Sequence, residues 1–198
     1  MYLLTLALKS LPDNAPAYLS WAVMLHDIGK PETIVKEGGR IIFHNHAQKS
    51  AELAQKILER LKFSTTEKKV IIYLVENHMK IAHIEKMRPS KRMAFLTDYR
   101  MDDLIKLTKA DQRGKIPTEL DFAKELEKMS KEAKKQKKKI YKKKNEKIFS
   151  GDDLIKMGIE AGPIYSEILQ EVEDRIISGE IVDRNDAVKF INKNYDFK

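Results

Sequence analysis

Two adjacent residues with metal-binding side chains, His26 and Asp27, lie at the end of an apolar helical pattern. The imidazole falls on the buried face of that pattern, because its spacing continues the i, i+3, i+4 positions of Leu19, Ala22 and Val23. A neutral imidazole beside an ionised carboxylate is a ligand pair suited to a divalent cation. The alternative is a hydrogen-bonded core histidine followed by a solvated aspartate, since ionisable groups on a buried face indicate function only statistically.

Three further residues with ligand-competent side chains occupy similar places on other predicted helices: His46, His78 and Asp111. His78 and Asp111 each complete an apolar stripe at helical spacing, and His46 stands at the N-terminal end of another. A carboxylate on an apolar face costs several kcal/mol unless it is paired or bound to a cation. Four helices that each carry one such residue favour a shared metal centre over four unrelated polar side chains.

The elements that must position these residues are predicted to be almost entirely helical. Eight glycines and six prolines are few for 198 residues, and β-branched runs are rare, which favours an all-α fold. Helical periodicity and capping signals predict the longer helices at about 1–11, 16–28, 46–62, 65–78, 102–113, 120–147, 163–178 and 185–192. Shorter helices are predicted to begin at Pro89 and after Ser150.

Residues 33–43 are the exception, because they contain two short β-branched runs separated by Gly38 and Gly39. Paired glycines between such runs are typical of a tight β-hairpin turn. Two strands cannot form a core alone, so we expect a small hairpin inserted into a helical body.

Composition excludes several classes of protein. The chain has no cysteine, which rules out disulfides, zinc–thiolate sites and thiol nucleophiles, and which fits a cytoplasmic location. No apolar run approaches the roughly 20 residues that a membrane-spanning helix needs, so no membrane association is expected.

The net charge of +8 lies in one segment. Residues 124–147 contain twelve lysines and four acids, whereas the rest of the chain is neutral. A charge run of this kind is often only the solvated face of a helix. The alternative is an electrostatic footprint for the phosphate backbone of RNA, for which the candidate contacts are Lys134, Lys135, Lys138, Lys139, Lys142 and Lys143.

The charge pattern also divides the chain, because the residues after Ser150 carry eleven acids and only six bases. We therefore predict three parts: a helical domain at 1–119, a Lys-rich helix at 120–149 and a C-terminal helical subdomain at 150–198. A chain of this length can hold one sizeable core with a small appendage.

Taken in order, the motifs of the chain resemble those of a known family. They are Leu25-His26-Asp27-Ile28-Gly29-Lys30-Pro31, Phe43-His44-Asn45-His46, Glu76-Asn77-His78 and Ala110-Asp111-Gln112-Arg113-Gly114. The ordered set resembles the HD superfamily of metal-dependent phosphohydrolases, and within it the HD domain attached to bacterial tRNA nucleotidyltransferases and poly(A) polymerases. The segment that begins Ser150-Gly151-Asp152-Asp153 resembles the C-terminal helices of the same enzymes. The implied fold is an HD-domain helical bundle with a hairpin insertion and a C-terminal helical extension.

The resemblance also implies a divalent metal site, whose ligands would be His26, Asp27 and Asp111, supplemented by His46 and His78. The family's first ligand is a histidine about one helix earlier, and Leu4 stands at that place in this sequence. Loss of one imidazole is expected to weaken the site and to open a coordination position. Mg²⁺, Mn²⁺, Ni²⁺ and Fe²⁺ are all compatible with such ligands.

The implied activity is hydrolysis of a phosphoester in a nucleotide or in RNA. Asp27 and Asp111 would fix the geometry of the attacking water. Lys30 and Arg113 would neutralise phosphate charge, unless they are ordinary surface cations. The chain lacks the glycine-rich cradle and strand carboxylates of nucleotidyl transfer, so we do not expect it to add nucleotides by itself. The alternative is a weakly active or inactive RNA-binding body that binds tRNA together with a separate nucleotidyltransferase subunit.

Overall fold

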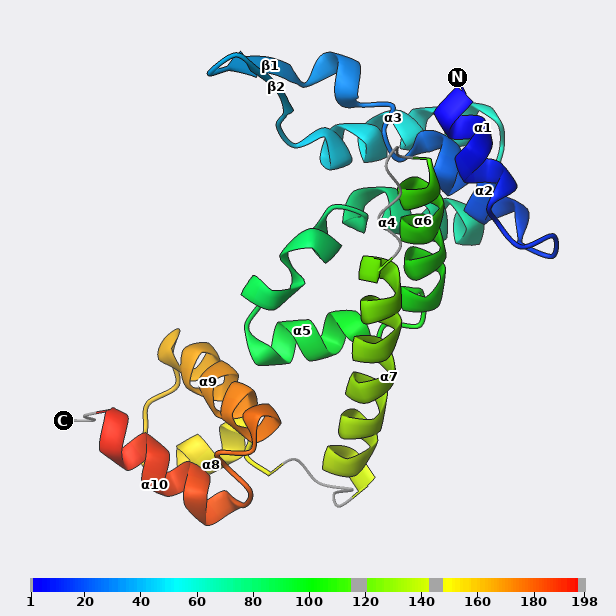
Figure 1. The fold of residues 1–198 in the computed structure, drawn as a ribbon. Helices are drawn as coiled ribbons and strands as arrows, with labels where there is room; N and C mark the ends of the chain where they lie inside the picture. The colour runs from blue at the N-terminus through cyan, green and yellow to red at the C-terminus, as the bar shows by residue number, and fades with distance from the viewer. Residues whose placement is uncertain (1, 115–120, 143–147, 196–198) are drawn as a thin grey trace. The chain divides into compact units, whose positions relative to one another are not determined.

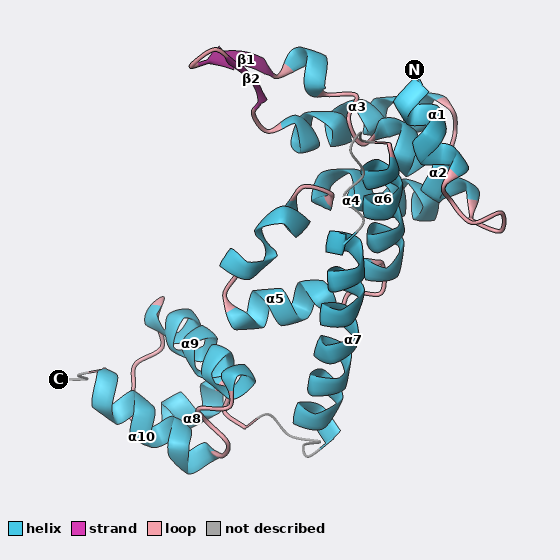
Figure 2. Cartoon of the chain, viewed as in Figure 1, coloured by secondary structure: helices cyan, strands magenta, loops and turns pink. Residues whose placement is uncertain are grey.

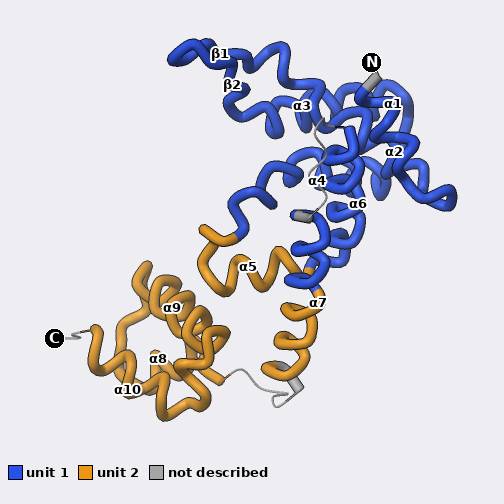
Figure 3. Tube along the Cα trace, in the orientation of Figure 1, with its two compact units in different colours: residues 1–84, 98–130 blue, residues 85–97, 131–198 orange. Residues whose placement is uncertain are grey.

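A computed structural model describes the backbone of residues 2–114, 121–142 and 148–195 (Figure 1). Within these ranges the chain is mostly helical with one two-stranded sheet, which confirms the predicted fold class (Figure 2). It falls into two compact units, one of residues 1–84 and 98–130 and one of residues 85–97 and 131–198 (Figure 3). The predicted three-part domain organisation stays a prediction, because compactness alone does not define an independently folding domain.

The first unit is a bundle of helices around a core that includes Leu19, Leu74 and Leu104, each with no exposed surface. Its helices are α1 (Tyr2–Lys9), α2 (Ala17–Leu25), α3 (His46–Arg60), α4 (Thr65–Asn77), α6 (Met101–Arg113) and the beginning of α7 (Asp121–Lys142). The 3₁₀ segments η1 (Lys30–Glu32) and η2 (Lys80–Lys86) follow α2 and α4. Because α2 packs against α4 and α6, and α3 packs against α4, the helices with candidate ligands are neighbours.

Helix ends mostly follow the capping signals of the sequence. α4 begins with a capping box, in which the N–H of Glu67 donates to the Ser64 hydroxyl and the Glu67 carboxylate accepts from the N–H of Ser64. The clearest difference is α2, which was predicted to reach residue 28 and ends at Leu25. His26 is the C-cap of this helix, residues 26–29 form turns, and the Gly29 N–H donates to the Ser50 hydroxyl of α3.

A β-hairpin links η1 to α3, as the paired glycines predict. Strands β1 (Ile34–Glu37) and β2 (Arg40–Phe43) are antiparallel, with Glu37 opposite Arg40. Gly38 and Gly39 have φ values of 56° and 77°, which suit a two-residue turn that matches the twist of the strands. Figure 2 shows the hairpin extending from the helices of the first unit. It joins the segment that carries His26 and Asp27 to the helix that begins with His46.

The second unit comprises α5 (Pro89–Leu96), the end of α7, α8 (Gly151–Lys156), α9 (Ile164–Ser178) and α10 (Arg184–Asn194). Its own core includes Leu154, Ile168 and Ile191, all without exposed surface. α5 is tied to α9 by a 2.6 Å hydrogen bond from the N–H of Ser90 to Asp174. In the part of the chain that the structure describes, no helix is long and apolar enough to cross a membrane.

Candidate metal centre

Five ligand-competent side chains meet in the first unit, and each comes from a helix terminus or the turn beside it. We call them the His–Asp cluster: His26, Asp27, His46, His78 and Asp111. His26 and His78 are the C-cap residues of α2 and α4, and His46 is the first residue of α3. The three imidazole side chains are at most 9% exposed, whereas Asp27 and Asp111 are 32% and 26% exposed. The carboxylates therefore form the accessible side of a mostly buried cluster.

Backbone carbonyls hold all three imidazoles in the same way. In each ring Nδ1 lies close to the carbonyl oxygen three residues earlier, at 2.8 Å for His26, 3.0 Å for His46 and 2.6 Å for His78. A carbonyl oxygen can only accept, so Nδ1 carries the proton and Nε2 of the neutral ring keeps its lone pair. This is how carbonyls around metal sites fix the tautomer and orientation of a histidine ligand.

The Nε2 atoms converge on Asp27. Its Oδ2 lies 3.3 Å from Nε2 of His26, which is also 3.4 Å from Oδ1 of Asp111. Its Oδ1 lies 3.4 Å from Nε2 of His46 and 3.8 Å from Nε2 of His78. Asp27 is thus shared by two ligand triads, one with His26 and Asp111 and one with His46 and His78. Within each triad the ligand atoms all lie within 4.8 Å of one another.

These separations fit ligands that surround a divalent ion. Two ligands that are each about 2.0–2.2 Å from one ion lie roughly 3.0–3.5 Å from each other. Nε2 of His46 and Nε2 of His78 are 3.3 Å apart, where two lone pairs repel unless a cation or a proton lies between them. Nε2 of His26 is buried and makes no hydrogen bond of good geometry. The donor set therefore fits a divalent cation.

The cluster perturbs the titration of its own members. Burial alone would lower the pKa of His26, but the carboxylates of Asp111 and Asp27 outweigh it and raise this pKa to about 9. Burial lowers the pKa of His78 to about 4. Burial would raise the pKa of Asp27, but His26 and the ammonium group of Lys30 hold it well below its ordinary value. In the absence of metal, the raised pKa of His26 means that its imidazole carries a positive charge beside Asp27 at neutral pH.

A close approach between backbones locks the His26–Asp27 turn onto α3. The N–H of Gly29 donates to the hydroxyl of Ser50 at 2.9 Å. A Cβ at Gly29 would lie 2.6 Å from the backbone N of Ser50 and 2.7 Å from the carbonyl oxygen of His46, so no side chain fits there. The role of Ser50 was not predicted from the sequence. Its signal was a hydroxyl on the buried face of α3, one turn after His46.

A cavity of about 430 Å³ opens onto this centre. His26, Asp27 and Asp111 line it, together with Leu4 of α1 and Lys30. Leu4 therefore lies in the same cavity as three candidate ligands. This agrees with the resemblance, which aligns Leu4 with the family's first histidine ligand. Nζ of Lys30 lies 2.5 Å from Oδ2 of Asp27, at the cavity.

Arg113 is not brought to the cavity. Its side chain is exposed, and its guanidinium donates to the carbonyl oxygen of Ser10 at 3.1 Å. It does not line the 430 Å³ cavity. The predicted role of Arg113 in neutralising phosphate charge thus has no support from its position.

Among the candidate RNA-binding lysines, those from Lys134 to Lys142 lie on the second half of α7. Lys135, Lys138 and Lys139 are exposed, and Lys134 is half-buried. The side chain of Lys142 and the whole of Lys143 lie outside the described residues, and RNA binding by these lysines stays a prediction.

Comparison with known proteins gives two findings. The sequence profile of a family described as HD domain matches residues 1–188 of this chain. An A-adding tRNA nucleotidyltransferase from Deinococcus radiodurans is 36% identical to it over 114 residues, which are 55% of this chain and 26% of that protein. The chain thus spans about a quarter of the length of this curated relative.

Proposed function

Because this chain belongs to the HD domain family, we propose that it is a metal-dependent phosphohydrolase that acts on phosphoesters of nucleotides or RNA. The observation that supports the proposal is the convergence of three imidazole Nε2 atoms on the carboxylate of Asp27. Imidazoles combined with carboxylates suit Mn²⁺, Fe²⁺ and Ni²⁺, and the carboxylates alone also suit Mg²⁺.

The proposed reaction is the addition of water across a P–O ester bond. The water oxygen bonds to phosphorus, the ester P–O bond breaks, and a proton from the water ends on the leaving alkoxide. A divalent cation, when bound, polarises the phosphoryl oxygen and lowers the pKa of water. Asp27 and Asp111 are placed at the accessible side of the cluster to accept hydrogen bonds from the attacking water. Lys30 lies at the same cavity and offsets the negative charge of the phosphate.

Metal content and hydrolysis in matched variants test this proposal. Wild-type protein, Asp27→Ala and the control Asp13→Ala are purified, incubated with Mn²⁺ and dialysed, and the metal per chain is measured. Asp13 is an exposed carboxylate in a loop, which neither lines the cavity nor belongs to the cluster. We expect Asp27→Ala to lose bound metal and hydrolysis of bis(p-nitrophenyl) phosphate, while Asp13→Ala keeps both. Equal metal content and equal rates in all three proteins would refute the proposal.

We propose RNA binding as a second candidate function, because of the exposed lysines on α7. Lys135, Lys138 and Lys139 present three exposed cations within two turns of the helix. Such a surface neutralises phosphates without reading bases. The relative from Deinococcus radiodurans is named for an action on tRNA, which makes tRNA the first RNA to test.

The test of RNA binding compares two triple charge reversals. Lys135, Lys138 and Lys139 are changed to Glu in one variant, and the exposed Lys36, Lys56 and Lys69 of the first unit are changed in the control. We expect the first variant to bind tRNA at least tenfold more weakly than the control in a filter-binding or polarisation assay at about 100 mM salt. Equal weakening by both variants would indicate attraction by net charge alone.

A further inference from the structure

A second cavity, of about 260 Å³, is lined by one residue of the His–Asp cluster that does not line the first. His46 lines it, whereas His26, Asp27 and Asp111 line the 430 Å³ cavity. Nε2 of His46 is 3.4 Å from Oδ1 of Asp27, so the His–Asp cluster contributes neighbouring residues to both cavities. We call the smaller one the His46 cavity.

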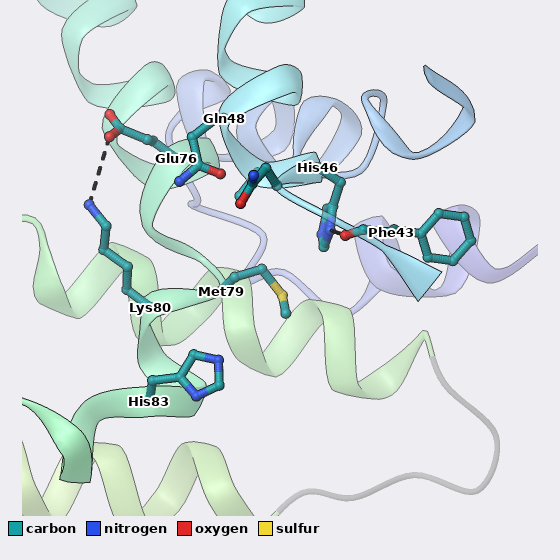
Figure 4. A pocket seen from close by; sticks show the side chains of 9 residues that line it. Phe43, His46, Gln48, Glu76, Met79, Lys80 and His83 are labelled. Carbon is teal, nitrogen blue, oxygen red and sulfur yellow. Dashed lines mark hydrogen bonds and ion pairs between the residues drawn. The ribbon is translucent and has the colours of Figure 1, made fainter. Parts of the chain in front are cut away.

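The walls of the His46 cavity suit a flat, partly polar group. Figure 4 shows the thioether of Met79 between the imidazoles of His46 and His83, whereas the ring of Phe43 extends to the far side of His46. Met79 is 42% exposed, although it is a large apolar side chain. Aromatic rings and thioethers stack on the faces of bases with little regard to base identity.

Polar groups complete the rim of the cavity. Glu76 and Lys80 form an ion pair there at 3.7 Å (Figure 4), and the amide of Gln48 is a further lining group. A few polar groups around an apolar floor are typical of small-molecule sites. The volume is slightly below the ~300–1,000 Å³ of pockets for drug-sized ligands, so it suits one nucleoside rather than a longer segment.

We propose that the His46 cavity is a nucleoside subsite, and that the substrate is a phosphodiester with one arm in each cavity. This inference rests on the proposed function. A phosphomonoester has one organic substituent and needs one cavity, whereas a diester has two. Hydrolysis then bonds the water oxygen to phosphorus and breaks one P–O bond. The products are a nucleoside alcohol, which takes the proton, and a phosphomonoester. Met79 and His83 are the residues that would contact the nucleoside in this subsite.

The test compares a dinucleotide with a monoester on the Mn²⁺-loaded full chain. The substrates are adenylyl-(3′→5′)-adenosine and p-nitrophenyl phosphate, and the variants are Met79→Ala and His83→Ala. Leu61→Ala is the matched control for Met79, because it removes a side chain that is 45% exposed at the far end of α3. Lys86→Ala is the control for His83, because it is exposed in the same 3₁₀ segment and outside both cavities.

We expect both subsite variants to lower kcat/KM for the dinucleotide by about tenfold or more, mainly through KM, as loss of one stacked base predicts. Their hydrolysis of p-nitrophenyl phosphate should stay within about twofold of wild type, and so should both controls with both substrates. An equal loss on the two substrates, or no loss on either, would overturn the subsite and leave the proposed function standing.

A binding measurement separates failure of the subsite from failure of the proposed function. If wild type hydrolyses neither substrate, the proposed function fails. The dinucleotide with 2-aminopurine in place of one adenine is then titrated and its fluorescence is followed. Weaker binding by Met79→Ala than by Leu61→Ala would support the nucleoside subsite without hydrolysis, and identical binding curves would overturn it as well.

Discussion

Each histidine of the His–Asp cluster is oriented by the backbone carbonyl three residues earlier in the chain, so a local contact orients a side chain of a site that several helices build. Because Nδ1 is committed to the carbonyl three residues earlier, Nε2 is the atom that each ring presents. The spacing of apolar residues predicted which imidazoles would be buried. It also favoured a shared centre, but it could not predict that Asp27 belongs to both ligand triads, because that depends on how the helices cross.

The titration of His26 and His78 predicts how the stability of the metal-free protein varies with pH. His26 has a folded-state pKa of about 9, above its ordinary 6.5, so its contribution is present below pH 6.5 and is lost as pH rises through 9. His78 has a folded-state pKa of about 4, so its contribution is present above pH 6.5 and is lost as pH falls toward 4. Urea unfolding in EDTA should therefore show greatest stability near pH 6.5.

Single substitutions assign the two limbs of that profile. His26→Gln should flatten the decline between pH 6.5 and 9, and His78→Gln should flatten the decline between pH 6.5 and 4. Saturating metal should also reduce the alkaline decline, because the ion replaces the proton on His26. A wild-type profile without change between pH 6.5 and 9 would contradict the assigned pKa of His26.

Replacement of Lys30 by Met should have opposite effects on the affinity for metal and on the rate of hydrolysis. The ammonium group lies 2.5 Å from Oδ2 of Asp27, an oxygen of the His26–Asp27–Asp111 triad, so it repels a bound cation. Lys30→Met should bind Mn²⁺ roughly 3- to 10-fold more tightly, which is on the order of 1 kcal/mol for a partly exposed pair. Hydrolysis of the diester should nevertheless slow, because the positive charge facing the phosphate is lost.

Calorimetric titration and kcat measured on the same preparations check these two effects. Lys36→Met removes an exposed lysine from β1 and is the control. A Lys30→Met variant that loses both metal affinity and activity would indicate that Lys30 holds the turn in place rather than facing the substrate.

At the level of elements, Gly29 is the position where α3 and the His26–Asp27 turn depend on each other. Its φ of −79° is accessible to any residue, so the cost of Gly29→Ala comes from the lack of space near Ser50 and His46. We expect a loss of about 1–3 kcal/mol in the free energy of unfolding, as for an overpacked core. Metal affinity should also fall, because the displaced backbone includes His46. Urea unfolding measures the first effect and dialysis with metal analysis the second.

Gly151→Ala is the matched control for that prediction. Gly151 begins α8 in the second unit, and an added Cβ would meet no atom within 4 Å. This substitution should leave the free energy of unfolding unchanged or slightly increased, because alanine is the better helix former. If the two substitutions cost the same, the close approach at Gly29 is not what holds the turn on α3.

Elements with strong local signals were well predicted from the sequence. The Ser64 capping box, the Gly38–Gly39 turn and the helix start at Pro89 each confirm a local rule, because few residues decide the outcome. The end of α2 was predicted three residues too late, since the contact that ends it comes from Ser50 in another helix. The two cavities left no local signal, because they form between elements.

At the scale of the molecule, the candidate metal ligands and the exposed lysines of α7 belong to different units. The His–Asp cluster belongs to the first unit, and Lys135, Lys138 and Lys139 belong to the second. The sequence predicted a boundary near Ser150 from the change in charge, but residues 131–198 fall in one unit, so the separation of these lysines from the cluster was not predicted at that position. It did not predict that α5 groups with α9, because their link, from Ser90 to Asp174, joins residues 84 positions apart.

This separation predicts that metal binding and RNA binding can be removed independently. The triple Lys→Glu variant of α7 should keep the wild-type metal content and lower the slope of log affinity for tRNA against log salt by about 2–3, near 0.7–0.9 for each lost contact. Asp27→Ala should lose metal but keep both the tRNA affinity and the slope. Metal analysis and tRNA titrations at several salt concentrations, on both variants, decide the matter. If Asp27→Ala weakened tRNA binding as much as the triple variant, the His–Asp cluster would itself be part of the RNA-binding surface. The lysines of α7 would then not form an independent binding site.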